Sequence, residues 1–250
     1  MGTKVKKIIS YKKFNTLKNK WEKSLYMDKK VRALSKKLFI QADKNQFHYL
    51  QSWNGEPIIQ TPDDIVNTIK ILFKTSPEII IEVGVAWGGS ILMYESLSKS
   101  IPIKKIIGID IFIPRDLKNR IKKKTKNSKK IILIEGSSID DRIIKRLKKL
   151  VKSGKSFFIH LDSNHTSEHV YKELLIYTKF LKSKNYLIVG DTVLAFIPYQ
   201  KHRPRPWNKN NNPYTALRKF LKNNKLFKID KKLNYNQLIT NQPLGYIYKK

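Results

Sequence analysis

The 250-residue chain contains no cysteine. Disulfides, thiolate metal sites and cysteine nucleophiles are therefore excluded. No apolar run approaches the roughly 20 residues that span a bilayer. The basic N-terminal stretch "MGTKVKKIISYKKF" also lacks the continuous apolar segment of a signal peptide. These absences favour a cytoplasmic protein and leave contact with a membrane surface open.

Acidic residues are scarce: 19 Asp and Glu stand against 52 Lys and Arg, for a net charge of +33. Such a charge is typical of proteins that bind nucleic acids or anionic surfaces. The lysines are nevertheless spread over the whole chain together with Ile and Asn, as in proteins encoded by AT-rich DNA, and no zinc finger, basic zipper or aromatic RNA-binding signature is present. We therefore expect no nucleic-acid partner. The alternative, a non-catalytic nucleic-acid or anionic-surface binding protein on the same fold, stays open because a fold does not fix a function.

The pattern of apolar residues predicts an N-terminal helical arm at 1–46 and one domain at 47–250. In the arm, Leu17, Trp21 and Leu25 recur at helical spacing, which predicts packing against the domain. Further along, five apolar runs alternate with helical segments, and two more strands are expected near 226–230 and 237–249. The five runs lie at 78–85, 105–112, 130–136, 156–162 and 186–192. This alternation predicts an α/β fold with a parallel sheet covered on both faces.

Most of these apolar runs end in an acid, which is unusual in a chain so poor in acids. The five acids are Glu82, Asp110, Glu135, Asp162 and Asp191. Single acids often cap the helix that follows, which explains one or two of them. Ligands of open α/β sheets bind at the carboxyl ends of the strands, so the whole set predicts a site at that edge.

Two loops after strands have the composition of a nucleoside site. The first, "EVGVAWGGS" (82–90), is neither a G-x-G-x-x-G motif nor a P-loop, and it follows a strand and opens a helix. An acid before Gly84 and Asp110 at the next strand end suit a ligand with a ribose diol and a cationic centre. The second loop, "EGSSID" (135–140), places Gly136, Ser137 and Ser138 where they could shape an adenine pocket or cap a helix.

The stretch "LDSNHTSEHV" (161–170) permits two interpretations. His165 to His169 spell H-x-x-E-H, a zinc-protease motif that requires a helix of its own. Alternatively, Asp162 and His165 form a strand-end acid with a base on the next turn, since an imidazole is suited to remove a hydroxyl proton. Asp191 would then face Asp162, and two carboxylates can hold a hard divalent cation such as Mg²⁺. We favour the second interpretation and treat His160 and His169 as structural residues.

A family resemblance covers the chain from about Phe47 to the end. The segments "IIEVGVAWGGS", "IIGIDI", "LIEGSSID", "LDSNHTSEHV", "YLIVGDT" and "RPWNKNNNPYTALRKFL" occur in that order. They resemble the cephalosporin hydroxylase family, also described as rhamnosyl O-methyltransferase-like, whose members are S-adenosylmethionine-dependent methyltransferases. The resemblance implies a class I methyltransferase fold, Rossmann-like and doubly wound, with a seven-stranded sheet and an antiparallel last strand.

The resemblance also implies roles for individual residues. His165 would be the catalytic base, and Asp162 and Asp191 would be catalytic and would hold Mg²⁺ or another divalent metal. Asp110 would bind the cofactor ribose, and Gly136, Ser137 and Ser138 would lie near its adenine. The methionine and ribose part would be lined by Glu82, Gly84, Gly88, Gly89 and Ser90.

One departure from the family concerns the metal. Members often carry a second acid directly before the Asp of the fifth strand, and here that position is Gly190. The resemblance predicts an O-methyltransferase that acts on a sugar hydroxyl in polysaccharide, glycolipid or secondary-metabolite biosynthesis, and we expect a homo-oligomer. The basic loop at 201–205 and Trp207 could hold a phosphorylated or acidic sugar.

Overall fold

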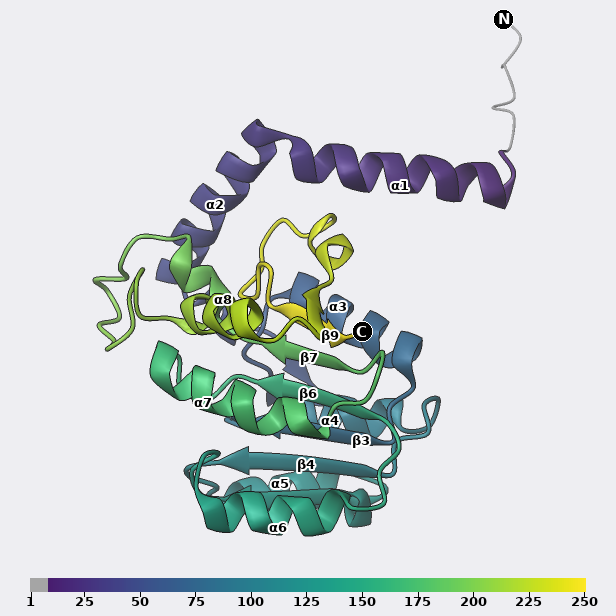
Figure 1. The fold of residues 1–250 in the computed structure, drawn as a ribbon, viewed down its shortest axis with the longest axis vertical. Coiled ribbons are helices and arrows are strands. Elements are labelled where there is room, and N and C mark those ends of the chain that lie inside the picture. Colours follow the sequence, from purple (N-terminus) through teal and green to yellow (C-terminus); the bar gives the residue numbers. More distant parts are fainter. Residues whose placement is uncertain (1–8) are drawn as a thin grey trace, which may run out of the picture.

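The computed structural model describes residues 9–250, which form a seven-stranded sheet flanked by helices (Figure 1). The strands are β3 (Ile79–Val83), β4 (Lys105–Asp110), β5 (Ile131–Glu135), β6 (Phe157–Leu161), β7 (Tyr186–Val189), β8 (Phe227–Ile229) and β9 (Tyr246–Lys249), with a separate small pair β1 (Ser52–Trp53) and β2 (Glu56–Pro57). The helices are α1 (Tyr11–Met27), α2 (Lys29–Lys44), α3 (Pro62–Thr75), α4 (Gly89–Leu97), α5 (Arg115–Lys124), α6 (Asp141–Val151), α7 (Ser167–Tyr177) and α8 (Pro213–Asn223).

The strand order is β5-β4-β3-β6-β7-β9-β8. Strands β3 to β7 pair in parallel, whereas β9 runs antiparallel to both of its neighbours. The predicted α/β class and the antiparallel last strand are therefore confirmed. The order reverses between β3 and β6, and in open α/β sheets such a reversal places a crevice at the carboxyl ends of the strands.

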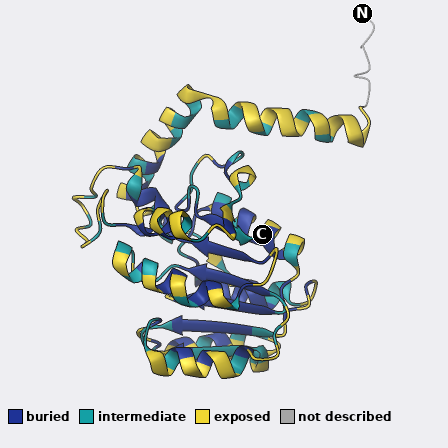
Figure 2. Ribbon diagram, in the orientation of Figure 1, coloured by how far each residue is buried: buried dark blue, intermediate teal, exposed yellow. Residues whose placement is uncertain are grey.

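Alternate residues of each strand build two separate cores, one on each face of the sheet. Ile79, Ile81 and Val83 pack toward α6, α7 and α8, while Ile80 of the same strand packs toward α3, α4 and α5. Because both faces are covered, the central strands carry no polar alternation, which explains their continuous apolar runs. Figure 2 shows the buried sheet between helices that are exposed on their outer sides.

In the N-terminal arm, α1 runs above the body in Figure 1 and buries none of its residues, although Tyr26 packs on Tyr235 with ring centroids 5.0 Å apart. Helix α2 contributes the buried side chains Phe39 and Asp43. One detail of the sequence prediction is wrong. The segment 237–241 is not a strand, because its polar groups bond to the buried Asp64 of α3. No helix in the described part of the chain is both long and apolar enough to cross a membrane.

Candidate active site

The acids predicted at the strand ends do meet at one edge of the sheet. Glu82 lies at the end of β3, Asp110 ends β4, and Asp162 and Asp191 follow β6 and β7. The fifth acid, Glu135, ends the outer strand β5, where it is exposed and accepts the backbone N–H of Ile113 at 3.2 Å. The acids that the topology brings together are therefore those of the four inner strands.

The turn after β3 depends on Gly84. Its φ of +94° lies in the region that favours glycine, and a Cβ there would stand 2.2 Å from the backbone oxygen of Asp162. The carboxylate of Asp110 closes the turn by accepting the N–H groups of Val85 at 2.7 Å and Ala86 at 3.1 Å. The loop therefore passes directly over the end of β6, with its shape set by an acid from β4.

Two pockets open on this edge, and they share the residues Gly84, Ala86, Asp162 and Trp207. The first pocket lies over β4 and β5. Its lining includes Asp110, Ile111, Gly136, Ser137, Ser138 and His169. The second pocket lies over β3, β6 and β7. Its lining includes Glu82, Ser90, His165 and Asp191, together with residues of the N-terminal segment and of the loop after β7. The two pockets therefore form one continuous site with Asp162 at their junction.

Gly88 and Gly89 line neither pocket. A Cβ on Gly88, whose φ is +83°, would stand 2.9 Å from the side chain of Ile121 in α5. A Cβ on Gly89 would stand 2.3 Å from the backbone oxygen of Pro57 in β2. These two glycines let the start of α4 pack closely against α5 and β2, and their contact with a cofactor stays a prediction.

Glu82 is buried beneath the second pocket. It accepts a hydrogen bond from Ser90 at 2.7 Å and one from Tyr94 at 3.4 Å. Its other neighbour is His160, whose Nδ1 lies 3.7 Å away. Burial by itself lowers the pKa of His160, but the carboxylates of Glu82 and Asp162 raise it overall. His160 is thus a buried partner of acids, in agreement with its predicted structural role.

A buried cluster supports the first pocket, and the sequence analysis missed it. Glu173 of α7 accepts hydrogen bonds from Ser138 at 2.6 Å and Ser163 at 2.7 Å. His169 lies 3.0 Å from Ser138 and 3.2 Å from Glu173. The cap of α6 is Asp140, so Ser138 does not have the capping role considered for it. The i,i+4 spacing of His169 and Glu173 on one helix face was the available signal.

The predicted base, His165, has an acidic partner and an aromatic neighbour. His165 Nε2 lies 3.3 Å from Asp191 Oδ2, and the two side chains are 15% and 27% exposed. The Trp207 ring stands edge-on to the imidazole, with ring centroids 4.8 Å apart. Asp191 adopts a φ of +48°, an uncommon backbone conformation outside glycine that is often found at functional sites. An imidazole oriented by a carboxylate and open to a pocket has the geometry of a general base.

The carboxylate of Asp162 accepts no hydrogen bond within residues 9–250, and its nearest cationic partner, His160 Nε2, is 3.9 Å away. Burial raises the pKa of Asp162 to about 6, with His160 opposing the rise and Asp191 adding to it. A Cβ on Gly190 would stand 2.1 Å from Asp162 Oδ1, so Asp162 itself fills the space beside Gly190. Asp162 and Asp191 alone meet the minimum for Mg²⁺, which keeps most of its water in such sites.

The histidines of the H-x-x-E-H motif do not converge. His165 faces Asp191, whereas His169 faces Ser138 and Glu173. Residues 9–250 contain no group of three or more His, Cys, Asp or Glu side chains placed to hold a metal ion. The geometry therefore argues against the zinc interpretation and favours the pairing of Asp162 with His165.

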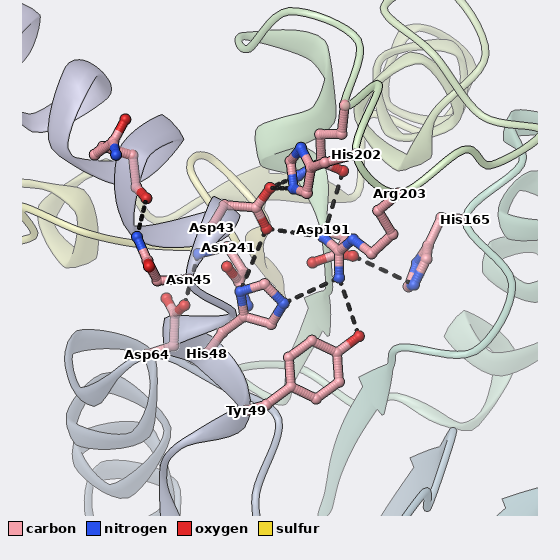
Figure 3. A network of polar contacts seen from close by, with 12 residues as sticks. Asp43, Asn45, His48, Tyr49, Asp64, His165, Asp191, His202, Arg203 and Asn241 are labelled. Carbon is pink, nitrogen blue, oxygen red and sulfur yellow. Dashed lines mark hydrogen bonds and ion pairs between the residues drawn. The ribbon is translucent and has the colours of Figure 1, made fainter.

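The outer wall of the second pocket comes from segments far apart in the sequence (Figure 3). Arg203 donates to Asp43 at 2.9 Å, to Tyr49 at 3.0 Å and toward His48 Nε2 at 3.0 Å. His202 Nε2 lies 2.9 Å from the same Asp43. Burial lowers the pKa of His48, which suits a neutral ring that accepts from Arg203. Helix α2 and the segment after it thus help to build the site, and no local sequence pattern signals this.

Comparisons with known proteins agree with the fold. A family model described as Rhamnosyl O-methyltransferase/CmcI matches residues 45–250. Rhamnosyl O-methyltransferase of Mycobacterium tuberculosis (strain H37Rv) is 28% identical over 133 residues, 52% of this chain and 51% of that protein. The Mycobacterium leprae protein of the same name is 29% identical over 147 residues, 57% and 61% of the two chains. The match thus spans about half the length of the first of these relatives.

Two solved structures of CmcI have the same fold. The apo structure has a TM-score of 0.54 at 18% identity and covers 80% of this chain and 76% of that chain. The structure with Mg and SAM has a TM-score of 0.52 at 17% identity and covers 81% and 77%. At these identities the likeness concerns the fold, which is that of class I methyltransferases.

Proposed function

The chain belongs to the Rhamnosyl O-methyltransferase/CmcI family, and we propose that it is an S-adenosylmethionine-dependent O-methyltransferase that methylates a sugar hydroxyl. The observation that carries the proposal is the junction of the two pockets at Gly84 and Asp162. One pocket offers groups suited to a nucleoside and the other offers His165 beside Asp191. A methyl donor and an acceptor hydroxyl bound in these two pockets would meet at that junction.

The cofactor roles follow from the linings. The carboxylate of Asp110 accepts three backbone N–H groups, and its remaining lone pair can accept from a ribose hydroxyl. Gly136, Ser137 and Ser138 border the space for adenine. Glu82, Gly84 and Ser90 border the space for the methionine part, and Gly88 and Gly89 place the helix beside it. When bound, S-adenosylmethionine supplies a methyl group on a positively charged sulfur.

The chain's own residues prepare the acceptor. His165 would take the proton of the acceptor hydroxyl, so that its oxygen could bond to the methyl carbon as the carbon–sulfur bond of the donor breaks and the neutral thioether leaves. Asp191, 3.3 Å from Nε2, stabilises the imidazolium that results and holds the ring in place. Asp162 borders the same space and can orient the sugar by accepting a hydrogen bond from a neighbouring hydroxyl, since the reacting hydroxyl has a single proton to donate. The walls hold donor and acceptor in one geometry, and such positioning is a large part of catalysis in bimolecular reactions.

A divalent ion fits this site only weakly. Asp162 and Asp191 would hold it, and it would supply positive charge that lowers the pKa of the acceptor hydroxyl. With Gly190 in place of an acid, the described residues provide only two carboxylates. A sugar is proposed as acceptor because the similar proteins are rhamnosyl O-methyltransferases. The chain matches 51% and 61% of the length of the two relatives named above. A surface polysaccharide, glycolipid or secondary metabolite as acceptor, a homo-oligomeric state and a cytoplasmic or membrane-peripheral location belong to the same proposal.

Titration calorimetry with S-adenosylmethionine and S-adenosylhomocysteine tests the cofactor, and absence of binding to the folded protein would refute the proposal. Mass spectrometry of cell-surface glycans with and without the protein should reveal a species heavier by one methyl group. DNA or RNA binding that persists at high salt would favour the non-catalytic alternative, because purely electrostatic binding is lost as salt rises.

A further inference from the structure

The mouth of the second pocket is basic, while its floor is acidic. The loop from Tyr199 to Trp207 contains Lys201, His202, Arg203 and Arg205 and no acid. Of these, Arg203 and Arg205 line the pocket, whose floor carries Glu82, Asp162 and Asp191. One cavity therefore has positive side chains at its mouth and negative side chains at its floor.

The two arginines differ in how far their charge is already compensated. Arg203 is held by Asp43, whose side chain is only 3% exposed. Its guanidinium donates further to Tyr49, and toward His48 and Gln200, so it is fixed in place and largely neutralised. Arg205 is exposed, and its side chain has no hydrogen bond or ion pair within the described residues. Arg205 thus presents an uncompensated positive charge at the pocket.

Trp207 connects this charge to the catalytic base. The Arg205 guanidinium lies 5.8 Å from the centroid of the Trp207 ring. The centroid of the His165 ring lies 4.8 Å from that of Trp207. A flat aromatic surface is a common support for a ligand ring, and a guanidinium beside it keeps its N–H donors available for a phosphate or carboxylate. A sugar ring held against Trp207 therefore has one side toward His165 and another toward Arg205.

We propose that the acceptor is an anionic sugar, one that carries a phosphate or a carboxylate, and that Arg205 binds this group while Trp207 supports the ring. The inference rests on the proposed methyl transfer and narrows its substrate class. Arg203, held by Asp43, is a positioning residue that fixes the loop from which Arg205 projects. A neutral glycan would leave the charge of Arg205 without a partner.

The test measures sugar binding to the protein saturated with S-adenosylhomocysteine by titration calorimetry. The probes are glucose 1-phosphate, glucuronate and the neutral methyl glucoside. Hydrogen bonds to charged groups predict that at least one anionic sugar binds about 10- to 100-fold tighter than the neutral one. The first two probes distinguish phosphate from carboxylate as the recognised group.

Arg205→Gln should abolish this preference while S-adenosylhomocysteine still binds. The matched control is Arg218→Gln on α8, which removes another exposed arginine that lines neither pocket and should keep the preference. Equal binding of charged and neutral sugars, or an equal loss in both variants, would overturn the inference and leave the methyltransferase proposal standing. Failure to bind S-adenosylhomocysteine at all would instead refute the proposed function, and the inference with it.

Discussion

Replacing Gly84 by alanine gives the most direct test of the site, because two separate costs can be worked out from the structure. The first is the backbone conformation, since a φ of +94° costs about 1–2 kcal/mol for a residue with a Cβ. The second is space: the new Cβ would stand 2.2 Å from the backbone oxygen and 2.7 Å from the carbonyl carbon of Asp162. Ordinary contacts begin at 3.4 Å, so β3 and β6 would have to separate at the pocket junction.

Overpacking of this kind costs about 1–3 kcal/mol, which brings the loss of unfolding free energy to about 2–5 kcal/mol. A shift of about 1 Å at a site that positions reacting groups can cost on the order of 100-fold in reaction rate. Because the displaced loop lines the pocket assigned to the cofactor, we also expect a clear loss of S-adenosylhomocysteine affinity. Urea unfolding measures the first quantity and titration calorimetry on the folded variant measures the second. Far-UV circular dichroism establishes that the variant used for binding is folded.

Gly55→Ala is the control. Gly55 lies in the exposed turn between β1 and β2 with a φ of +75°, and the nearest atom to its added Cβ is Lys124 Nζ at 3.3 Å, the end of a flexible side chain. The variant therefore pays the conformational cost of about 1–2 kcal/mol without the clash, and it should bind S-adenosylhomocysteine normally. Unchanged affinity in Gly84→Ala, or equal affinity losses in both variants, would refute the assignment of the Gly84 turn to the cofactor site.

Three further predictions concern the base, the metal and the support of the site. His165→Gln should lower methyl transfer by about 10²- to 10⁴-fold, because the acceptor hydroxyl then lacks its base. Transfer of labelled methyl to extracted glycans measures this loss, and unchanged turnover excludes the base role. Magnesium should bind only in the millimolar range at Asp162 and Asp191, so calorimetric binding at micromolar concentration would contradict a two-carboxylate site. The buried carboxylate of Glu56 pairs with Arg120 and Lys124. Glu56→Gln should lower the free energy of unfolding by about 1–3 kcal/mol at pH 7. The loss is smaller than for a fully buried ion pair because solvent reaches both cations. Burial raises the pKa of Glu56, but its hydrogen bonds to those cations lower it overall, so the wild-type advantage in urea unfolding should shrink as the pH falls below the ordinary value of 4.5.

The central sheet could be predicted because its signal is local. Strands buried on both faces need apolar residues at every position, and a run such as "EIIIEVGV" shows this without reference to the rest of the chain. The segment 237–241 has a similar appearance, yet Gln237, Thr240 and Asn241 bond to Asp64, more than 170 residues earlier. A contact at that separation leaves no periodic trace, so the strand prediction there was wrong.

The same distinction applies to the site. The strand-end rule located Glu82, Asp110, Asp162 and Asp191 because each follows its own apolar run. It could not locate the wall formed by Asp43 and Arg203, which are 160 residues apart and meet only through the fold. Nor could it predict that the carboxylate of Asp162 occupies the space beside Gly190, where a side chain at position 190 would otherwise lie.

Asp162 differs from the other three inner acids in a way that bears on mechanism. Glu82 and Asp110 accept hydrogen bonds from the protein, and Asp191 has His165 at 3.3 Å. Asp162 accepts no hydrogen bond from the described residues, its nearest imidazole, His160, is 3.9 Å away, and burial favours its protonated form. A polar group left without protein partners in a pocket is expected to find them in a ligand. An acceptor hydroxyl, a hydrated divalent ion or the positive charge of the cofactor would each satisfy it, and all three belong at the junction of the two pockets. We therefore propose that the chemistry centres on Asp162, with His165 and Asp191 on the acceptor side and Asp110 on the nucleoside side.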